Sequence, residues 1–258
     1  MIEYMKLLRY APIHFPRRCI RSSCSKEKRS GCRIEPIVMQ TWVSNKLGWL
    51  HYHSWFKFRR MNQDLDFYFF DDIQAEEYMR LNWGKEKIYQ VYASVKHGPA
   101  KADIFRYCYI YDNGGYYFDI KSGCKIPLSK SHNCSEDSFL FFEGNVSILP
   151  SKIKKNIPYR QNIVAQWAFG FKRKHPFLKL LIRNIESFDF ESVEYLSVKD
   201  SVLVSTGPGM FSCSIADYLN SGKSLFFNNI DINGNGQYIL QGAASRYLER
   251  QSYVKSQQ

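Results

Sequence analysis

Residues 98–123 decide the fold, and they read GPAKADIFRYCYIYDNGGYYFDIKSG. Pro99 suits the first turn of a helix, and the glycine pair at 114–115 suits its end. The aromatic run at 116–118 then predicts a short strand. This order delivers Asp119 at the carboxyl end of that strand, where open α/β sheets form their ligand crevices.

Three more charged side chains belong to the same stretch. Asp103 and Arg106 are three residues apart, so they share one face of the predicted helix. Lys121 follows Asp119 by two residues, so strand alternation sends both to one face. Each feature alone is ordinary, because an Asp/Arg pair on a helix is more often a surface ion pair worth under ~1 kcal/mol. Their order along the chain, together with further motifs, is what indicates a site.

Strands and helices are also predicted to alternate in the sequence before this stretch. A buried strand is predicted at 37–39, leading into a polar turn with Trp42 at its mouth. The apolar run at 65–70 is typical of a strand covered on both faces. Asp71 and Gln74 have the spacing of a capping box at the start of a helix.

The sequence after it continues the alternation. We expect one strand in SFLFFEG (138–144) and a mixed strand and turn in QNIVAQWAFGF (161–171). A helix should begin at Pro176, and the loop at 206–209 should lead into another helix. The whole pattern predicts an α/β fold with a mainly parallel sheet flanked by helices. The expected regions are a basic N-terminal extension (1–33), one α/β domain (34–250) and a C-terminal tail (251–258).

The positive charge is concentrated at the start of the chain. Residues 1–33 hold nine Lys or Arg against two Glu, which is +7 of the net +12. This distribution favours contact with an anionic membrane surface or a polyanionic glycan, and it argues against a nucleic-acid partner. A solvated tail is the alternative interpretation of the extension. No apolar run approaches the ~20 residues that span a bilayer, so we expect a soluble, cytoplasmic protein that contacts the membrane peripherally.

The cysteine count favours free thiols. Seven cysteines is an odd number, which is more typical of a reducing compartment. In an oxidising compartment, Cys124 and Cys134 are the pair that a short loop would bring together.

Taken in order, the motifs resemble glycosyltransferase family thirty-two, the group with a sugar-binding region containing a DxD motif. The most specific part is KADIFRYCYIYDNGGYYFDIKSG (101–123). IVMQTW (37–42), MNQDLDFYFFDD (61–72) and STGPGMFS (205–212) resemble the first strand, the second strand with its acidic end, and the T-G-P loop of that family. The resemblance implies a GT-A fold, and it implies transfer of a sugar from a GDP- or UDP-linked donor with retention of anomeric configuration. The implied acceptors are a polysaccharide such as a capsule, a glycolipid or a protein glycan.

The resemblance also implies a role for each of several residues. The implied donor-binding residues are Gln40, Thr41, Trp42, Asp103, Arg106 and Asp119. The implied catalytic group is Asp103, Arg106, Asp119 and Lys121. The positions near the sugar or acceptor are Asn162, Thr206, Gly207 and Pro208, and the metal positions are Asp119 and Gln241.

Two of these positions depart from the family pattern. Lys121 stands where the second acid of the motif would hold Mn²⁺ or Mg²⁺, and a protonated lysine is no metal ligand. Gln241 stands where many members have a metal-binding histidine. The expectation is a weak or altered dependence on Mn²⁺ or Mg²⁺, with Lys121 supplying a positive charge to the departing diphosphate.

Several alternatives stay open at this level. Trp42 stacks a nucleotide base or is a core aromatic residue. A retaining transfer needs a carboxylate or polar groups near the anomeric carbon, and the segments that reach the crevice offer Glu143, Gln161, Asn162 and Gln166. The alternative function is a catalytically impaired sugar- or membrane-binding module that keeps the fold, because Lys121 breaks the acid pair.

Overall fold

The structure is a computed structural model. It describes residues 18–25, 27, 29–120, 122–124, 126–143, 163–194, 196–228 and 239–240.

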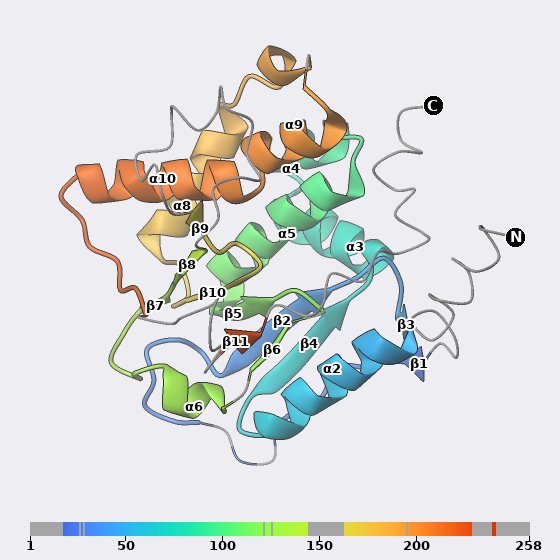
Figure 1. Cartoon of the computed structure of the whole chain (residues 1–258). Helices are drawn as coiled ribbons and strands as arrows, with labels where there is room; N and C mark the ends of the chain where they lie inside the picture. Colours follow the sequence, from blue (N-terminus) through green and yellow to red (C-terminus); the bar gives the residue numbers. More distant parts are fainter. Residues whose placement is uncertain are drawn as a thin grey trace, which may run out of the picture.

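A five-stranded sheet lies at the centre of the molecule (Figure 1). Its order is β4 (Asp66–Phe70), β2 (Ile37–Thr41), β5 (Gly115–Phe118), β10 (Ala168–Phe171) and β7 (Ser138–Phe139). Strand β2 pairs in parallel with β4 and β5, whereas β10 pairs antiparallel with β5 and β7. Four of the five strands therefore run in one direction, which confirms the mainly parallel sheet.

Both faces of the sheet are covered, because neighbouring residues of each strand enter different cores. On β5, Tyr117 packs into a large cluster with helix residues on one face. Tyr116 and Phe118 pack into a second cluster on the other face, with Phe58 and Leu128. A strand buried on both faces needs apolar side chains at every position. This requirement explains the continuous apolar and aromatic runs in the sequence.

Helix α5 (Gly98–Asn113) is the central helix of the larger layer (Figure 1). Every residue from Asp103 to Ile110 is buried, including both members of the Asp/Arg pair. The helix ends where the sequence predicted, at two glycines with φ of 69° for Gly114 and 98° for Gly115. The helices around it in this layer are α3 (Asp72–Trp83), α4 (Lys87–Ser94), α8 (Pro176–Glu186), α9 (Val198–Ser205) and α10 (Pro208–Asn220).

Two helices cover the opposite face of the sheet, α2 (Trp49–Met61) and α6 (Leu128–Ser131). The predicted capping box at α3 is confirmed, since Asp71 Oδ1 accepts from the backbone N–H of Gln74 and Gln74 Oε1 accepts from that of Asp71. No helix among the described residues is long and apolar enough to span a bilayer.

The remaining elements are short. A 3₁₀ turn, η2, covers Glu191–Val193. Three two-stranded antiparallel pairs join β1 (Arg18–Cys19) to β3 (Lys46–Leu47), β6 (Gly123–Cys124) to β11 (Ile239–Leu240), and β8 (Phe142–Glu143) to β9 (Ile163–Val164). The single strand expected at 138–144 is therefore two strands, β7 and β8, because β7 pairs with β10 in the main sheet and β8 pairs with β9 outside it.

The described part of the basic extension lies along the edge of the main sheet. Ser23 forms an antiparallel bridge with Phe67 of the edge strand β4. Arg29 Nε donates to Asp64 Oδ2 at 3.0 Å, and Ile20 is buried. The domain boundary at residue 34 stays a prediction, but residues shortly before it already pack against the domain and cover a sheet edge that would otherwise be open.

The cysteine pairing differs from the expectation of free thiols. Cys32 and Cys134, 102 residues apart, form a disulfide. Cys134 is thus paired with the extension and not with Cys124, because folding brings distant chain segments together in a way that cysteine spacing does not reveal. Disulfides persist in oxidising compartments, so this pairing contradicts the interpretation of the cysteine count as reducing.

Candidate active site

The centre of the candidate site is a buried arginine held between two carboxylates. Arg106 Nη2 lies 3.1 Å from Asp103 Oδ1, and Arg106 Nη1 lies 3.6 Å from Asp119 Oδ1. The guanidinium also stacks over the ring of Tyr117, with its carbon 4.2 Å from the ring centroid. The structure therefore brings together the helix pair and the strand-end acid that the sequence singled out.

A glutamine just before β10 completes this arrangement. Gln166 Nε2 donates to Asp103 Oδ1 at 2.8 Å, and Gln166 Oε1 accepts from Arg106 Nη1 at 3.2 Å. The same Nε2 lies 2.7 Å from the hydroxyl of Tyr107. Of the four polar residues that the sequence left open near the anomeric carbon, Gln166 is the one whose side chain is described, and it lies at the Asp/Arg pair.

The T-G-P loop reaches the pair from the far end of the chain. Thr206 caps the end of α9 and its hydroxyl donates to Asp103 Oδ2 at 3.0 Å. Gly207 and Pro208 then begin α10. Because Thr206 is fully buried and its hydroxyl faces Asp103, its contact in this structure is with the carboxylate and not with solvent.

Burial sets the charge states of this group. Burial raises the pKa of Asp103, while Arg106 and two donated hydrogen bonds oppose that rise. For Arg106, burial alone would lower the pKa, but the oxygens of Tyr117, Asp103 and Asp119 together raise it above the ordinary arginine value. The ionised state of Asp103 therefore depends on its permanently charged neighbour.

Asp119 is the member of this group that meets solvent. Its side chain is 26% exposed, against 9% for Arg106 and 7% for Asp103. The hydroxyl of Tyr117 donates to Asp119 Oδ1 at 2.6 Å, and burial keeps the pKa of Tyr117 well above its ordinary value, so this phenol stays a donor. One oxygen of Asp119 is thereby occupied by the protein, which fixes the orientation of the carboxylate.

The expected base-binding residues follow the neighbouring strand. Met39 of β2 lies opposite Tyr117 of β5, so Thr41 is at the level of Asp119 at the same sheet edge. Gln40 is 1% exposed and its Nε2 has no hydrogen-bond partner among the described residues. Trp42 is half-buried and stacks on His51 with ring centroids 5.8 Å apart. No hydrogen bond between described residues joins these three side chains to the Asp103–Arg106–Asp119 group, so their donor-binding role stays a prediction.

Comparison with known proteins identifies the region that contains this site. Residues 40–139 match the family described as "Glycosyltransferase sugar-binding region containing DXD motif". Residues 40–139 thus correspond to the sugar-binding region of that glycosyltransferase family. Among the solved structures, the chain is similar to "PaToxG Glycosyltransferase", with a TM-score of 0.53 and 12% identity over 86% of this chain and 77% of that one. This likeness confirms the GT-A fold.

Curated proteins similar to this chain include two from Schizosaccharomyces pombe. The chain is 30% identical over 163 residues to "Initiation-specific alpha-1,6-mannosyltransferase", which is 58% of this chain and 40% of that protein. It is 26% identical over 181 residues to "Inositol phosphoceramide mannosyltransferase 3", which is 68% of this chain and 43% of that protein. The chain thus matches less than half the length of these two relatives.

The described residues of the chain contain no metal cluster. No group of three or more His, Cys, Asp or Glu there could hold an ion, and Asp119 offers one carboxylate whose Oδ1 is already engaged by Tyr117. These residues alone do not fit a protein-built metal site. Lys121, Asn162, Gln161 and Gln241, and the side chain of Glu143, lie outside the described part of the structure.

Two residues of the candidate site were not anticipated from sequence. Tyr117 lies two residues before Asp119 on β5, so strand alternation alone would have placed it on the same face. Tyr107 follows Arg106 and donates its hydroxyl to the backbone oxygen of Thr206 at 2.8 Å. Nothing in the local sequence marks Tyr107, because its partner is 99 residues away.

Proposed function

We propose that this glycosyltransferase moves a hexose from a GDP- or UDP-linked donor to a glycan or glycolipid acceptor, with retention of anomeric configuration. One observation carries the proposal, namely a buried Arg106 held between Asp103 and the partly exposed Asp119 at the carboxyl end of a central strand. Such a pre-oriented cation beside an accessible carboxylate suits a ligand that combines sugar hydroxyls with a diphosphate.

Asp119 and Arg106 are the proposed donor contacts. The free oxygen of Asp119 accepts from ribose or sugar hydroxyls, and Arg106 directs its positive charge toward the phosphates. Asp103, Gln166 and Thr206 act through Arg106, because their hydrogen bonds fix its position. Thr206 is thus proposed as a positioning residue, a change from the sugar-proximal role first expected.

The remaining roles rest on sequence and on neighbouring geometry. Trp42, with Gln40 and Thr41, is proposed to hold the base at the end of β2. Lys121 is proposed as the counter-charge for the departing diphosphate. Asn162, Gly207 and Pro208 are proposed to border the transferred sugar or the acceptor.

The relatives suggest which donor and acceptor to test first. All four matching curated proteins are named mannosyltransferases, and three of them are named for inositol phosphoceramide. We therefore propose mannose as the sugar and a glycolipid as one acceptor class. The basic extension fits a membrane-borne acceptor, and the Cys32–Cys134 disulfide favours an oxidising compartment over the cytoplasm first expected.

Release of GDP or UDP from a panel of nucleotide sugars tests the transfer proposal. The Asp119→Asn variant should lose about 100-fold in kcat/KM, because the amide cannot accept as a charged group does. Glu77→Gln, an exposed substitution on α3, is the matched control and should be unchanged. The alternative, a binding module without transfer activity, predicts no nucleotide release from any donor, and equal rates in Asp119→Asn and Glu77→Gln would contradict the assigned site.

The metal dependence needs a separate measurement. Thermal unfolding is followed with each nucleotide sugar, with and without Mn²⁺, where a ligand at 100 times its dissociation constant stabilises by ~2.7 kcal/mol. If Lys121 is the phosphate counter-charge, the preferred donor shifts the transition without metal, and Lys121→Ala abolishes that shift. A shift seen only with Mn²⁺ would contradict this role for Lys121.

A further inference from the structure

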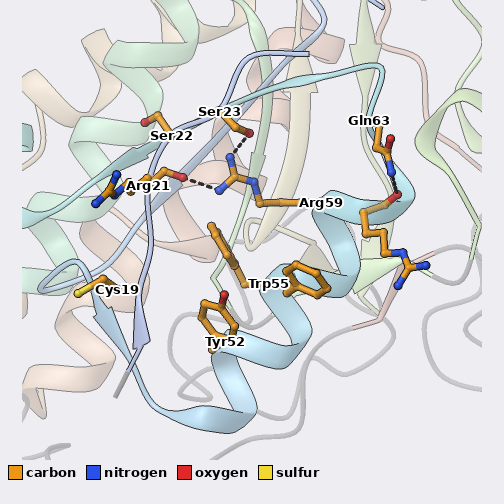
Figure 2. A pocket seen from close by; sticks show the side chains of 10 residues that line it. Cys19, Arg21, Ser22, Ser23, Tyr52, Trp55, Arg59 and Gln63 are labelled. Atoms are coloured by element: carbon orange, nitrogen blue, oxygen red, sulfur yellow. Dashed lines mark hydrogen bonds between the residues drawn. The ribbon is translucent and has the colours of Figure 1, made fainter. Parts of the chain in front are cut away.

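A second hollow lies away from the Asp103–Arg106–Asp119 group, between helix α2 and the N-terminal segment 19–23 (Figure 2). Its volume is about 640 Å³, within the range of small-molecule sites. The lining residues are Cys19, Arg21, Ser22, Ser23, Tyr52, Trp55, Phe56, Arg59, Arg60 and Gln63. None of the sequence motifs or the family match assigns a role to this hollow.

One face of α2 supplies an aromatic row. Tyr52, Trp55 and Phe56 stand at i, i+3 and i+4, so they are neighbours on the helix surface. Tyr52 stacks with Phe56 at a centroid distance of 6.3 Å and an interplanar angle of 15°. Phe56 is 49% exposed. Exposed, nearly parallel rings of this kind offer flat surfaces to the C–H face of a sugar ring.

The same hollow has positive charge and no negative charge. Arg21, Arg59 and Arg60 line it, and none of the described lining residues is acidic. Within the described part of the chain, no carboxylate forms an ion pair with any of these three arginines. Burial lowers the pKa of Arg59 to about 10, so it remains a cation whose charge is incompletely solvated. An anion entering the hollow would meet uncompensated charge.

Arg59 is held rigidly at the floor of the hollow. Its guanidinium donates to the backbone oxygen of Arg21 and to the hydroxyl of Ser23, as the dashed lines in Figure 2 show. Its carbon lies 4.4 Å from the ring centroid of Trp55 and 5.0 Å from that of Phe67. An arginine fixed in this way loses little conformational entropy when it binds a ligand.

One small hydrophobic core connects the hollow to the strand end that bears Asp119. Trp55 packs in one small core with Phe69 and Ile120, and Trp42 packs against that core. Ile120 directly follows Asp119 in the chain. The residues that line the hollow and the strand end that bears Asp119 therefore contact one shared hydrophobic core.

We infer that this hollow binds a phosphorylated saccharide, with the sugar ring on Tyr52 and Phe56 and the phosphate at the arginines that line it. Aromatic faces alone would suit a neutral sugar, and arginines alone would suit any anion. Their combination selects a ligand that has both a ring and a phosphate. The inference does not depend on the proposed transfer reaction, because it concerns binding in the absence of any nucleotide sugar.

Calorimetric titration of the full chain with mannose 6-phosphate tests the inference, with mannose and inorganic phosphate as separate ligands. The phosphorylated sugar should bind at least about tenfold more tightly than either one. The Phe56→Ala/Arg60→Gln double variant should weaken that binding about tenfold or more. Ile73→Ala/Arg80→Gln, which removes an exposed apolar side chain and an exposed arginine from α3, should bind as the parent does. Equal affinity for phosphate alone, or equal affinity of the two double variants, would overturn the inference.

A vesicle arm separates a soluble source of the ligand from a lipid headgroup. Phosphatidylcholine vesicles carrying phosphatidylinositol, whose headgroup is a phosphorylated ring, should retain the protein if a glycolipid headgroup is the source. That retention should fall in Phe56→Ala/Arg60→Gln and should exceed retention on phosphatidylserine vesicles of the same charge. Binding to mannose 6-phosphate without retention would assign the hollow to soluble phosphosaccharides. Equal retention on both anionic vesicles, unaffected by the double variant, together with no binding of mannose 6-phosphate, would overturn the proposal in favour of simple charge attraction.

Discussion

Arg106 is the residue on which the candidate site depends, because it touches both carboxylates at once. Its Nη2 faces Asp103 and its Nη1 faces Asp119, a division that the single ammonium of lysine cannot reproduce. Arg106→Lys should therefore keep the charge and lose the geometry, lowering kcat/KM about 100-fold. Steady-state kinetics with circular dichroism as a folding check measures this, and Arg80→Lys on exposed α3 serves as the control. A variant that folds and keeps more than half of its activity would contradict the role given to Arg106.

The same residues show which parts of the candidate site could be predicted from the sequence and which could not. The spacing of Asp103 and Arg106 and the place of Asp119 after a strand were enough to predict that they meet. The partners that fix them, Gln166 and Thr206, lie 63 and 103 residues from Asp103. Their hydrogen bonds arise from the packing of α5 against distant segments, which no local pattern specifies.

The pH dependence of the protein's stability can be predicted from single residues, and His175 is one of them. Its Nδ1 accepts from the backbone N–H of Phe177 at the start of α8, and burial lowers its pKa from 6.5 to about 4. Below pH 6.5 the unfolded chain takes up a proton that the folded chain refuses, so stability falls as pH falls toward 4. Burial likewise lowers the pKa of His132 to about 4. We therefore expect each of the two histidines to lower the free energy of unfolding by about 2 kcal/mol when the pH falls from 7.5 to 5.

Urea unfolding at these two pH values measures that loss. His175→Asn keeps a side-chain acceptor at the helix start but does not titrate, so its loss between the two pH values should be smaller by about 2 kcal/mol. His53→Gln, at an exposed position, should lose as much as the parent. If His175→Asn shows the full loss, the acid sensitivity has another origin.

At the scale of elements, the junction between α5 and β5 brings the chain close to the neighbouring strand β2. Gly115 has φ of 98°, and a Cβ there would lie 2.6 Å from the backbone oxygen of Ile37. Gly222 also has positive φ, 76°, but a Cβ there would meet nothing within 4 Å. Gly115→Ala should therefore lower the free energy of unfolding by about 3 kcal/mol or more. Gly222→Ala should lower it by about 1 kcal/mol, from backbone strain alone. Equal costs in urea unfolding would show that close approach to β2 does not matter.

Elements with strong local signals were predictable, and those defined by distant pairing were not. The glycine pair at 114–115, the capping box at Asp71 and the helix start at Pro176 all occur where sequence placed them. The run at 138–144 looked like one strand because residues 139–142 within it are all apolar. It divides into β7 and β8 because each half finds a different partner, and strand pairing is not encoded in composition.

At the scale of the whole molecule, the Cys32–Cys134 disulfide determines how firmly the N-terminal segment is fixed. It closes a loop of 102 residues, for which chain entropy predicts a stabilisation of about 4–5 kcal/mol. Reduction with dithiothreitol should lower the unfolding temperature of the parent chain. A Cys32→Ser/Cys134→Ser variant should start lower and show no response to the reductant. An unchanged unfolding temperature, with both thiols shown to be free by mass spectrometry, would contradict a structural disulfide.

The Cys32–Cys134 disulfide should also affect ligand binding in the hollow between α2 and residues 19–23, because the two sides of this hollow are held by different contacts. Helix α2 is packed on the sheet through Phe58, whereas the wall bearing Arg21 and Ser23 belongs to the segment that the disulfide ties down. Freeing that segment should release Arg59 from its contacts with Arg21 and Ser23. Reduction should therefore weaken the binding of mannose 6-phosphate several-fold while nucleotide release at Asp119 changes little, since Asp119 is held by α5 and β5. Equal losses of both would mean that the disulfide supports the whole domain and that the hollow has no separate dependence on the segment.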